Sequence, residues 1–496
     1  MTVPSEQGRE AVAAVGARDW RLAVGGRLRP ADGGRTYDVE CPATEARLAA
    51  APDASAEDVD EAVRRAADAG SSWRALDVRE RGRRLRALAE AVRAHAEELA
   101  LLDALDSGNP LSAMRNDVSW GADVLDLFAD YGSHLGGSTI PASPDNLHFT
   151  RRSPFGVVAR IVPFNHPLFF AASKAAAPLM AGNTVVLKPS DITPLSALRL
   201  AEIADGILPP GVFSAVTSDG PTASSALVRH PLIRRIGFIG SDRVGRIIQR
   251  DAAEVGVKEI SLELGGKNAL IVCPDADLDA AATGIVNGMN FAWSEGQSCG
   301  STSRVLLHAS IADEVLELVR ERVAAIRIGF PSDPETQMGP LASRAQYDKS
   351  RLYIDVALAE GATLFQGGQR PQGGTFERGH YLEPTIFTDV RPSMRIAQEE
   401  VFGPVMSVLT WTDLDDAVAI ANGVDYGLTA SVWTRDVSTA LGLADRIQAG
   451  YVWINGSSRH FWGVPFGGTK SSGTGREESV EELLSYTELK AVNVLV

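Results

Sequence analysis

Cysteine is scarce in this chain of 496 residues. The three cysteines, Cys41, Cys273 and Cys299, lie too far apart for a zinc knuckle or a redox pair. So sparse a set in a large chain is typical of a reducing compartment. The sequence therefore predicts a cytoplasmic protein, and its cysteine spacing gives no reason to expect a catalytic metal.

An excess of positive charge and long apolar runs are also missing. Lys and Arg number 48 against 63 Asp and Glu, which leaves a net charge of -15. Nucleic acids need a basic surface, and anionic membranes repel an acidic one. No stretch approaches the roughly 20 apolar residues that span a bilayer, and Met1 to Arg18 has no apolar signal core. We expect neither a nucleic acid nor a membrane as a partner.

The composition is that of an ordinary globular protein, with 45% hydrophobic and 22% charged residues. Its length is enough for about two or three folding units. Early in the chain Ser55 is a typical N-cap before a helix over Val59–Ala69. Apolar residues at helical spacing then predict a single long helix from about Arg79 to Leu105.

From Gly156 onward, short apolar runs alternate with helical segments, which indicates parallel sheets covered on both faces. The fold class is therefore α/β. The first set of expected strands is Val157–Val162, Thr184–Leu187, Val212–Val216 and Arg235–Ile239, with helices Leu168–Leu179, Pro194–Ile207 and Ser224–Val228 between them. A second set follows from Ala269, with Ala269–Val272, Arg304–Leu307, Ser407–Leu409, Ala430–Trp433 and Tyr451–Ile454, and helices Ile311–Ala325 and Asp415–Ala421.

One cysteine lies in a setting suited to chemistry. Cys299 is flanked by Gly296 and Gly300 and by small hydroxyl residues, whereas buried structural cysteines sit among branched apolar residues. An open loop leaves the sulfur able to attack a substrate. Because a free thiol has a pKa of about 8.5, a nucleophilic role also needs local help to form the thiolate.

Two further residues stand at the ends of expected strands. Glu263 alternates with Leu262 and Leu264 before a Gly-Gly turn, where it is either a solvated strand residue or a general base. Asn165 lies in a turn fixed by Pro163 and Pro167. It is either a turn former or an amide donor held rigid for an oxyanion.

Three more segments have features of a dinucleotide site. Lys188 and Asp191 follow a parallel strand, at the edge where such sheets bind ligands, and suit the hydroxyls of a ribose. The segment Gly237–Gly245 combines a strand, a tight turn and a helix start that favours a pyrophosphate, although its glycine spacing alone is a weak signal. Glu400 precedes Phe402 and a rigid turn, and the pair could bind a ribose or simply close a loop.

Taken in order, these segments resemble the NAD(P)-dependent aldehyde dehydrogenase superfamily over nearly the whole chain. One such match is weak, but the full ordered set is specific. The matching motifs are Pro163-Phe164-Asn165, Leu187-Lys188-Pro189-Ser190, Phe238-Ile239-Gly240-Ser241, Leu262-Glu263-Leu264-Gly265-Gly266-Lys267, Gly296-Gln297-Ser298-Cys299, Glu400-Val401-Phe402-Gly403-Pro404 and Pro465-Phe466-Gly467-Gly468-Thr469-Lys470-Ser471-Ser472-Gly473.

The resemblance implies a role for each matching residue. Cys299 would be the nucleophile, Glu263 the general base, and Asn165 an oxyanion donor together with the backbone N–H of Cys299. An aldehyde would pass through a cysteine thiohemiacetal and a thioester to a carboxylic acid. Lys188 would hold the adenosine ribose, Ser241 the pyrophosphate and Glu400 the nicotinamide ribose. The full set of implied cofactor residues is Lys188, Ser190, Asp191, Gly240, Ser241, Glu400 and Phe402.

Two departures from the family pattern bear on chemistry. Phe164 stands where many relatives have tryptophan, and we expect conserved packing there. Asp191 stands where relatives often have glutamate; its negative charge should still repel a 2′-phosphate, which favours NAD and leaves NADP open. CoA-acylating relatives typically lack the glutamate corresponding to Glu263, so hydrolysis is preferred over transfer to CoA. A non-catalytic relative of the fold is disfavoured because Cys299 and Glu263 are both present.

By the same resemblance, aromatic side chains line the substrate tunnel, and they favour an apolar or aromatic aldehyde. A trimethylammonium aldehyde of the betaine type is the alternative, because rings also attract such cations. His166 and His460 either add polarity to the pocket or are structural. The expected pocket residues are Phe164, Phe169, Phe170, Trp293, Phe461 and Phe466.

The resemblance also divides the chain into parts. Residues 1–131 and 153–265 would form a Rossmann-type NAD-binding domain, and 266–470 a second α/β catalytic domain. Residues 132–152 and 480–496 would form a small β element that joins subunits by pairing strand edges. The sequence predicts a homodimer or a homotetramer and does not choose between them.

Overall fold

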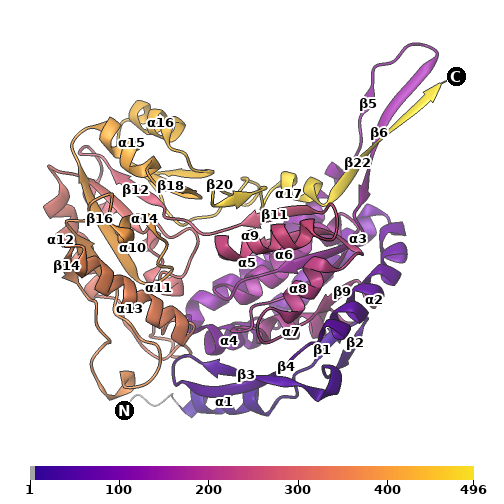
Figure 1. The fold of residues 1–496 in the computed structure, drawn as a ribbon, viewed down its shortest axis with the longest axis horizontal. Helices are drawn as coiled ribbons and strands as arrows, with labels where there is room; N and C mark the ends of the chain where they lie inside the picture. Colours follow the sequence, from indigo (N-terminus) through magenta and orange to yellow (C-terminus); the bar gives the residue numbers. More distant parts are fainter. Residues whose placement is uncertain (1–5, 496) are drawn as a thin grey trace.

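The computed structural model describes residues 6–495 and contains two α/β bodies with a narrow sheet projecting from one of them (Figure 1). The first five residues of the expected 1–131 segment, and Val496 of the expected tail, lie outside the described residues. The predicted α/β class is confirmed by this architecture. Within residues 6–495, none of the helices is long and apolar enough to cross a membrane.

The first body is built on a sheet with the strand order β2-β1-β9-β8-β7-β10-β11-β21. Its centre, from β9 to β11, is parallel, while β1 and β21 add antiparallel edges. The strands are β1 (Leu22–Val24), β2 (Arg27–Arg29), β7 (Val157–Ile161), β8 (Thr184–Lys188), β9 (Phe213–Ala215), β10 (Ile233–Ile239), β11 (Glu259–Glu263) and β21 (Gly473–Thr474).

Helices cover both faces of this sheet because its strands are apolar on both sides. Val157 and Ala159 of β7 pack toward α2, α8 and α9, whereas Val158 packs toward α3 to α7. The first group is α2 (Ala56–Ala75), α8 (Thr222–Arg229) and α9 (Asp242–Ala253). The second is α3 (Val78–Ala94), α4 (Ala96–Ser107), α5 (Leu111–Asp130), α6 (Pro167–Met180) and α7 (Leu195–Ala204).

The prediction of a single helix from Arg79 to Leu105 is wrong. The structure has two helices there, α3 and α4, which break at His95. The backbone of His95 leaves helical geometry at φ -107° and ψ 19°, and its ring Nδ1 lies 2.8 Å from the carbonyl oxygen of Ala91. A side chain that bonds the last turn in this way ends a helix without a proline or glycine, so the apolar spacing did not reveal the break.

The second body repeats the layered plan with the strand order β14-β15-β16-β13-β12-β18-β19, in which β14 alone is antiparallel to its neighbour. Helices α13 to α16 pack on one face and α10 to α12 on the other. The strands are β12 (Ala269–Val272), β13 (Arg304–His308), β14 (Thr363–Gln366), β15 (Thr385–Thr388), β16 (Val405–Trp411), β18 (Thr429–Trp433) and β19 (Tyr451–Ile454). The helices are α10 (Leu278–Gly288), α11 (Phe291–Ser294), α12 (Ala312–Ala324), α13 (Arg344–Ala359), α14 (Arg395–Gln398), α15 (Leu414–Asn422) and α16 (Val437–Arg446).

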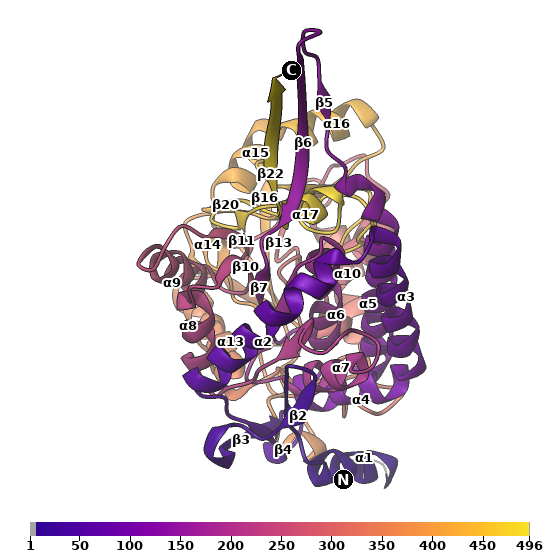
Figure 2. The same cartoon turned by 90° about the vertical axis from the view of Figure 1, so that its right-hand side faces the viewer.

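A three-stranded sheet projects from the first body in both views (Figures 1 and 2). Strand β6 pairs along its whole length with β22 near the C-terminus, and β5 adds to the other edge of β6. The strands are β5 (Thr139–Ile140), β6 (Asn146–Pro154) and β22 (Thr487–Leu495). The remaining elements are α1 (Glu6–Ala17), β3 (Thr36–Cys41), β4 (Ala46–Pro52), β17 (Tyr426–Gly427), β20 (Thr469–Lys470), α17 (Val480–Ser485) and the short 3-10 turns Asp32–Gly34, Tyr131–Leu135 and Gly374–Phe376.

The base of this projection is fixed by a buried arginine. The Arg160 guanidinium on β7 donates to the hydroxyl of Tyr486, and the Asn183 side-chain amide donates to the carbonyl of Tyr486 at 2.9 Å. Gly237, on the neighbouring strand β10, has no side chain in the space that the guanidinium fills. The buried position of the Arg160 guanidinium therefore depends on a glycine at residue 237.

Gly237→Ala should destabilise the protein by about 1–3 kcal/mol, because its methyl group would overlap Arg160 and lie 2.9 Å from the Tyr486 hydroxyl. The measurement is the melting temperature, which should fall by several degrees. Gly442→Ala is the control, since it adds a methyl in a helix with nothing within 4 Å, and its melting temperature should not fall. Equal melting temperatures for the two variants would contradict this account.

Candidate active site

Two cavities meet between the two bodies, and Cys299 and Glu263 line both of them. One is walled mainly by aromatic rings, and we call it the aromatic cavity. The other lies beside the turn after β10 and the loop before β16, and we call it the cofactor-side cavity. Phe170 and Ile239 also line both. A molecule in either cavity would therefore contact the same thiol and the same carboxyl group.

The Cys299 loop is held in place by Asn268. The Asn268 side-chain amide donates to the carbonyl oxygens of Cys299 at 2.7 Å and of Ser301 at 2.9 Å. Its own oxygen accepts the N–H of Thr429 at 3.0 Å, on the next strand of the second sheet. Sequence reasoning missed Asn268, although it follows the Gly-Gly-Lys motif directly.

Burial, together with the nearby carboxylates of Glu263, Glu400 and Glu478, raises the pKa of the Cys299 thiol to about 12. The backbone N–H of Gly300 acts weakly against them. The thiol is therefore protonated at neutral pH in this structure. A nucleophilic role requires a proton acceptor or an added positive charge close by.

Glu263 is the nearby group that can exchange a proton. It ends β11, and its carbonyl accepts the N–H of Gly240, which fixes the ends of two neighbouring strands together. Both carboxyl oxygens are buried without a hydrogen-bond partner among the residues described. Burial raises the pKa of this carboxyl well above its ordinary value, and the Glu477 charge adds to the effect. A carboxyl with such a raised pKa suits proton transfer near neutral pH.

Asn165 lies in the turn after β7, only 2% exposed, and lines the cofactor-side cavity together with Cys299. Its carbonyl oxygen accepts a hydrogen bond of 2.8 Å from the side-chain amide of Asn109 at the end of α4. This hydrogen bond ties the turn after β7 to the end of helix α4. The structure therefore brings Asn165, Cys299 and Glu263 to the wall of one cavity, as the sequence motifs suggested.

Four predicted cofactor residues line the cofactor-side cavity: Gly240, Ser241, Glu400 and Phe402. Ser241 caps α9, whose N-terminus has the unpaired N–H groups and positive partial charge that suit a phosphate. Glu400 accepts the N–H of Gly266 at 2.8 Å, and burial raises the pKa of its carboxyl. A side chain at Gly265 would overlap that carboxylate, so the turn is shaped around it. These residues fit a dinucleotide.

The other three predicted cofactor residues lie farther along the same sheet edge. Lys188 ends β8 and is buried, which lowers the pKa of its amine, while the Asp191 charge opposes the effect. The Ser190 hydroxyl donates to Asp191 Oδ1 at 3.3 Å. They are not among the residues that line the two cavities. Within residues 6–495, no group of three or more His, Cys, Asp or Glu side chains could hold a metal ion.

Four of the six expected substrate residues line the aromatic cavity: Phe169, Phe170, Trp293 and Phe466. Phe164 does not; its ring lies in the cofactor-side cavity, with its centroid 5.8 Å from that of Phe402. Phe461 is 47% exposed and lines a neighbouring hollow that shares Trp120, Trp293 and Trp462 with the aromatic cavity. Sequence reasoning missed three tryptophans of the aromatic cavity, Trp120, Trp453 and Trp462.

A buried ion cluster stands beside Glu263. The Glu477 carboxylate accepts from Arg160 at 3.0 Å and from Lys174 at 2.8 Å, and all three side chains are buried. Burial alone would raise the pKa of Glu477, but the two cations lower it to about 2. Glu477 is therefore a fixed negative charge close to the Glu263 carboxyl. The sequence signal for this cluster was Lys174, a charged residue inside an otherwise apolar helix.

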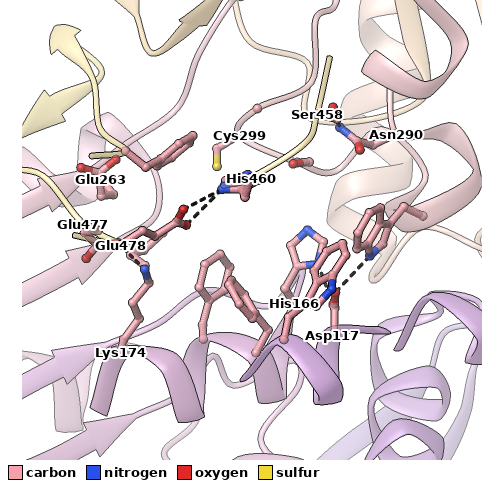
Figure 3. Close-up of a pocket in the computed structure, with 18 of the residues that line it drawn as sticks. Asp117, His166, Lys174, Glu263, Asn290, Cys299, Ser458, His460, Glu477 and Glu478 are labelled. Carbon is pink, nitrogen blue, oxygen red and sulfur yellow. Dashed lines mark hydrogen bonds and ion pairs between the residues drawn. The ribbon is translucent and has the colours of Figure 1, made fainter. Parts of the chain in front are cut away.

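Two histidines also line the aromatic cavity, each bonded to a carboxylate (Figure 3). His166 Nδ1 lies 2.8 Å from Asp117 Oδ2, and His460 Nδ1 lies 2.9 Å from Glu478 Oε2. Figure 3 shows His460 next to Cys299, and His166 next to Asp117. Polar groups are thus fixed at two places in a largely aromatic wall.

Known proteins resemble this chain in both sequence and structure. A sequence model of the aldehyde dehydrogenase family matches residues 29–492. Aldehyde dehydrogenase tropH of Talaromyces stipitatus is 46% identical over 460 residues, which are 91% of this chain and 89% of that protein. The NAD+ complex of aldehyde dehydrogenase from Bacillus cereus is 38% identical with a TM-score of 0.94, over 98% of each chain.

A third relative is the NAD+ complex of betaine aldehyde dehydrogenase from Staphylococcus aureus. It is 34% identical with a TM-score of 0.95, over 98% of this chain and 97% of that one. The resemblance that the motifs suggested is thereby confirmed, and the chain belongs to the aldehyde dehydrogenase family.

Proposed function

We propose that this protein oxidises an aldehyde to a carboxylic acid with NAD, using Cys299 as the nucleophile and Glu263 as the general base. The observation that carries the proposal is the position of these two residues, which line both cavities where they meet. The aldehyde occupies the aromatic cavity and the nicotinamide end of NAD the cofactor-side cavity. The NAD complexes of the Bacillus and Staphylococcus relatives support the choice of cofactor.

The first half of the reaction forms a covalent bond to sulfur. The Cys299 thiol releases its proton to solvent, and the sulfur attacks the aldehyde carbon, so that the carbonyl oxygen becomes an alkoxide. Asn165 and the backbone N–H of Cys299 stabilise that alkoxide as hydrogen-bond donors. Because Asn109 holds the Asn165 turn, this donor needs little reorganisation as charge develops.

A bound NAD would supply the hydride acceptor that the thiohemiacetal requires. Cys299 then carries the acyl group as a thioester. Glu263 takes a proton from water, the hydroxide attacks the thioester, and the acid leaves as the thiolate re-forms. The presence of Glu263 favours this hydrolysis over transfer to CoA.

Several residues of the chain would hold the cofactor. The N-terminus of α9 at Gly240 and Ser241 would bind the pyrophosphate, and Glu400 the nicotinamide ribose with Phe402 beside it. Lys188, with Ser190 next to it, would bind the adenosine ribose. Asp191 carries a negative charge at that end, which disfavours the 2′-phosphate of NADP.

The substrate that fits best is an apolar or aromatic aldehyde. Rings from α5, α6 and the loop after β19 wall the cavity, and such walls bind flat apolar groups. A trimethylammonium aldehyde is the second candidate, supported by the same rings and by the betaine aldehyde dehydrogenase relative. Carboxylates of Asp117, Glu477 and Glu478 line the cavity and disfavour an anionic substrate.

We also propose that residues 132–152 and 480–496 join subunits into a dimer or tetramer, with 1–131 and 153–265 as the NAD-binding domain and 266–470 as the catalytic domain. The projecting sheet supports this, because within the described chain β22 pairs only with β6 and leaves one edge open. Its surface carries exposed Leu147, Leu489 and Leu495. Pairing between copies would cover both the edge and these side chains.

Cys299→Ala should abolish aldehyde-dependent NADH formation while the protein still binds NAD, because among the described residues Cys299 supplies the one thiol that lines the two cavities. The measurement is absorbance of NADH with a panel of aldehydes, with NAD binding followed by titration of tryptophan fluorescence. Cys273→Ala, a buried cysteine of the second sheet, is the matched control and should remain active. Normal steady-state oxidation by Cys299→Ala would refute the assignment.

Glu263→Gln should slow thioester hydrolysis by about 10²- to 10⁴-fold, the usual contribution of a general base. Because the pKa of Glu263 is raised, its basic form appears only as pH rises above the ordinary carboxyl range. Wild-type turnover should therefore increase with pH where hydrolysis limits the rate, and the variant should lose that dependence. Stopped-flow measurement should show a burst of one NADH per site followed by slow turnover. A variant without a burst, or with wild-type turnover, would contradict this role.

Leu489→Asp should shift the protein toward smaller species, because it places a charge on the projecting sheet at a side chain 59% exposed in the single chain. Light scattering after size-exclusion chromatography measures the mass against the 52.7 kDa of one chain. Val437→Asp on α16, equally apolar and exposed, is the control and should keep the wild-type mass. A wild-type protein that elutes as a monomer would rule out the proposed assembly.

A further inference from the structure

The aromatic cavity contains two carboxylate–histidine pairs for which the proposed chemistry has no use. Asp117 and His166 form one, and Glu478 and His460 form the other. The carboxylates are almost wholly buried, with side chains 1% and 4% exposed, whereas the His166 and His460 side chains retain 14% and 28% exposure. The histidines are thus the members of each pair that remain accessible.

The bonding of each pair fixes which ring nitrogen carries a proton. An ionised carboxylate can only accept hydrogen bonds, so Nδ1 of each histidine must be the donor. In the neutral imidazole the other nitrogen, Nε2, is then a hydrogen-bond acceptor. Both oxygens of the Asp117 carboxylate have a partner, since Oδ1 accepts from the Trp293 indole at 3.2 Å and Oδ2 bonds His166. Its function is to orient the two rings.

Aromatic rings hold both histidines in position against the cavity. The His166 ring lies with its centroid 5.8 Å from Phe170 and 6.1 Å from Trp293, both nearly perpendicular to it. The His460 ring centroid lies 4.7 Å from that of Phe466, and Cys299 packs against the apolar cluster to which Phe466 belongs. In its neutral form each imidazole therefore has Nε2 as its acceptor, and the rings beside it belong to the cavity wall that a flat substrate would contact.

We infer that the aromatic cavity selects an aromatic aldehyde bearing a ring hydroxyl group, which donates a hydrogen bond to Nε2 of His166 or His460. The inference rests on the proposed function and narrows its substrate class. A hydroxyl group is the neutral donor that matches an imidazole acceptor. A substrate without it would leave that acceptor unpaired in a largely apolar pocket, which weakens binding in the transition state.

Other polar substrates fit this wall less well. A carboxylate would meet Asp117, Glu477 and Glu478, and the lysine in the cavity, Lys174, is already paired with Glu477. A trimethylammonium group would find aromatic rings, but it has no hydrogen-bond donor for the two imidazoles. The geometry therefore favours a neutral hydroxyl group over either charge.

The test compares kcat/KM of the wild-type enzyme with NAD for benzaldehyde, 3-hydroxybenzaldehyde and 4-hydroxybenzaldehyde, and for the two corresponding methoxybenzaldehydes. At least one hydroxy isomer should exceed both benzaldehyde and its own methyl ether by about tenfold, the value of one hydrogen bond. Equal or lower values for the hydroxy isomers would overturn the inference. So would a preference for 4-carboxybenzaldehyde or betaine aldehyde over the hydroxy isomers.

Variants then assign the acceptor. His166→Phe or His460→Phe should bring the ratio of kcat/KM for the preferred hydroxybenzaldehyde to that for benzaldehyde toward one, and the corresponding Gln variant, which keeps an acceptor, should restore part of it. His308→Phe, on β13 outside both cavities, should keep the wild-type ratio. If both Phe variants kept the wild-type ratio, the inference would be overturned and the proposed function would stand. Failure to oxidise any aldehyde would instead overturn the proposed function, and this inference with it.

Discussion

The hydrogen bonds of the Asn268 side chain hold together the parts from which the site is made. Asn268 follows directly on the turn that leaves the first sheet after Glu263, and it enters the second sheet at β12. Its amide nitrogen bonds the carbonyls of Cys299 and Ser301, and its oxygen bonds the backbone of Thr429. One side chain thus links the thiol loop to the second sheet. The backbone of residues 264–267 joins the same side chain to Glu263 at the end of the first sheet.

The electrostatics of the site depend on charges that are fixed rather than free to titrate. Glu477 is held ionised by Arg160 and Lys174 in a buried cluster. Its permanent negative charge, added to burial, raises the pKa of Glu263. At Cys299, burial and the charges of Glu263, Glu400 and Glu478 raise the pKa of the thiol and so work against a thiolate. Glu263 is therefore a strong proton acceptor, whereas Cys299 is a weakly acidic thiol. Positive charge brought by a ligand would lower the pKa of both groups.

The sequence was sufficient for the α/β class, the family and the strands that end at the site, because these depend on local apolar patterns and on short motifs. It was insufficient where contacts join distant segments. The pairing of His166 with Asp117 spans 49 residues, and that of Arg160 with Glu477 spans 317. In the loop after β19, no periodicity decides whether Phe461 or Trp462 lines the aromatic cavity, and the structure places Trp462 there and Phe461 on a neighbouring hollow. The break at His95 likewise depends on one side-chain contact.

The chain returns to its starting sheet after building the second one. Strand β21 pairs with β11, so that Leu262 lies opposite Thr474 and Glu263 opposite Gly473. The outgoing and returning segments are thus paired with each other at Glu263. Both strands belong to the first sheet, so this pairing anchors the two ends of the segment that builds the second body at one place. Any bending between the bodies would therefore fall on the residues just beyond these strands, among them Leu264 and Gly265, which line the cofactor-side cavity.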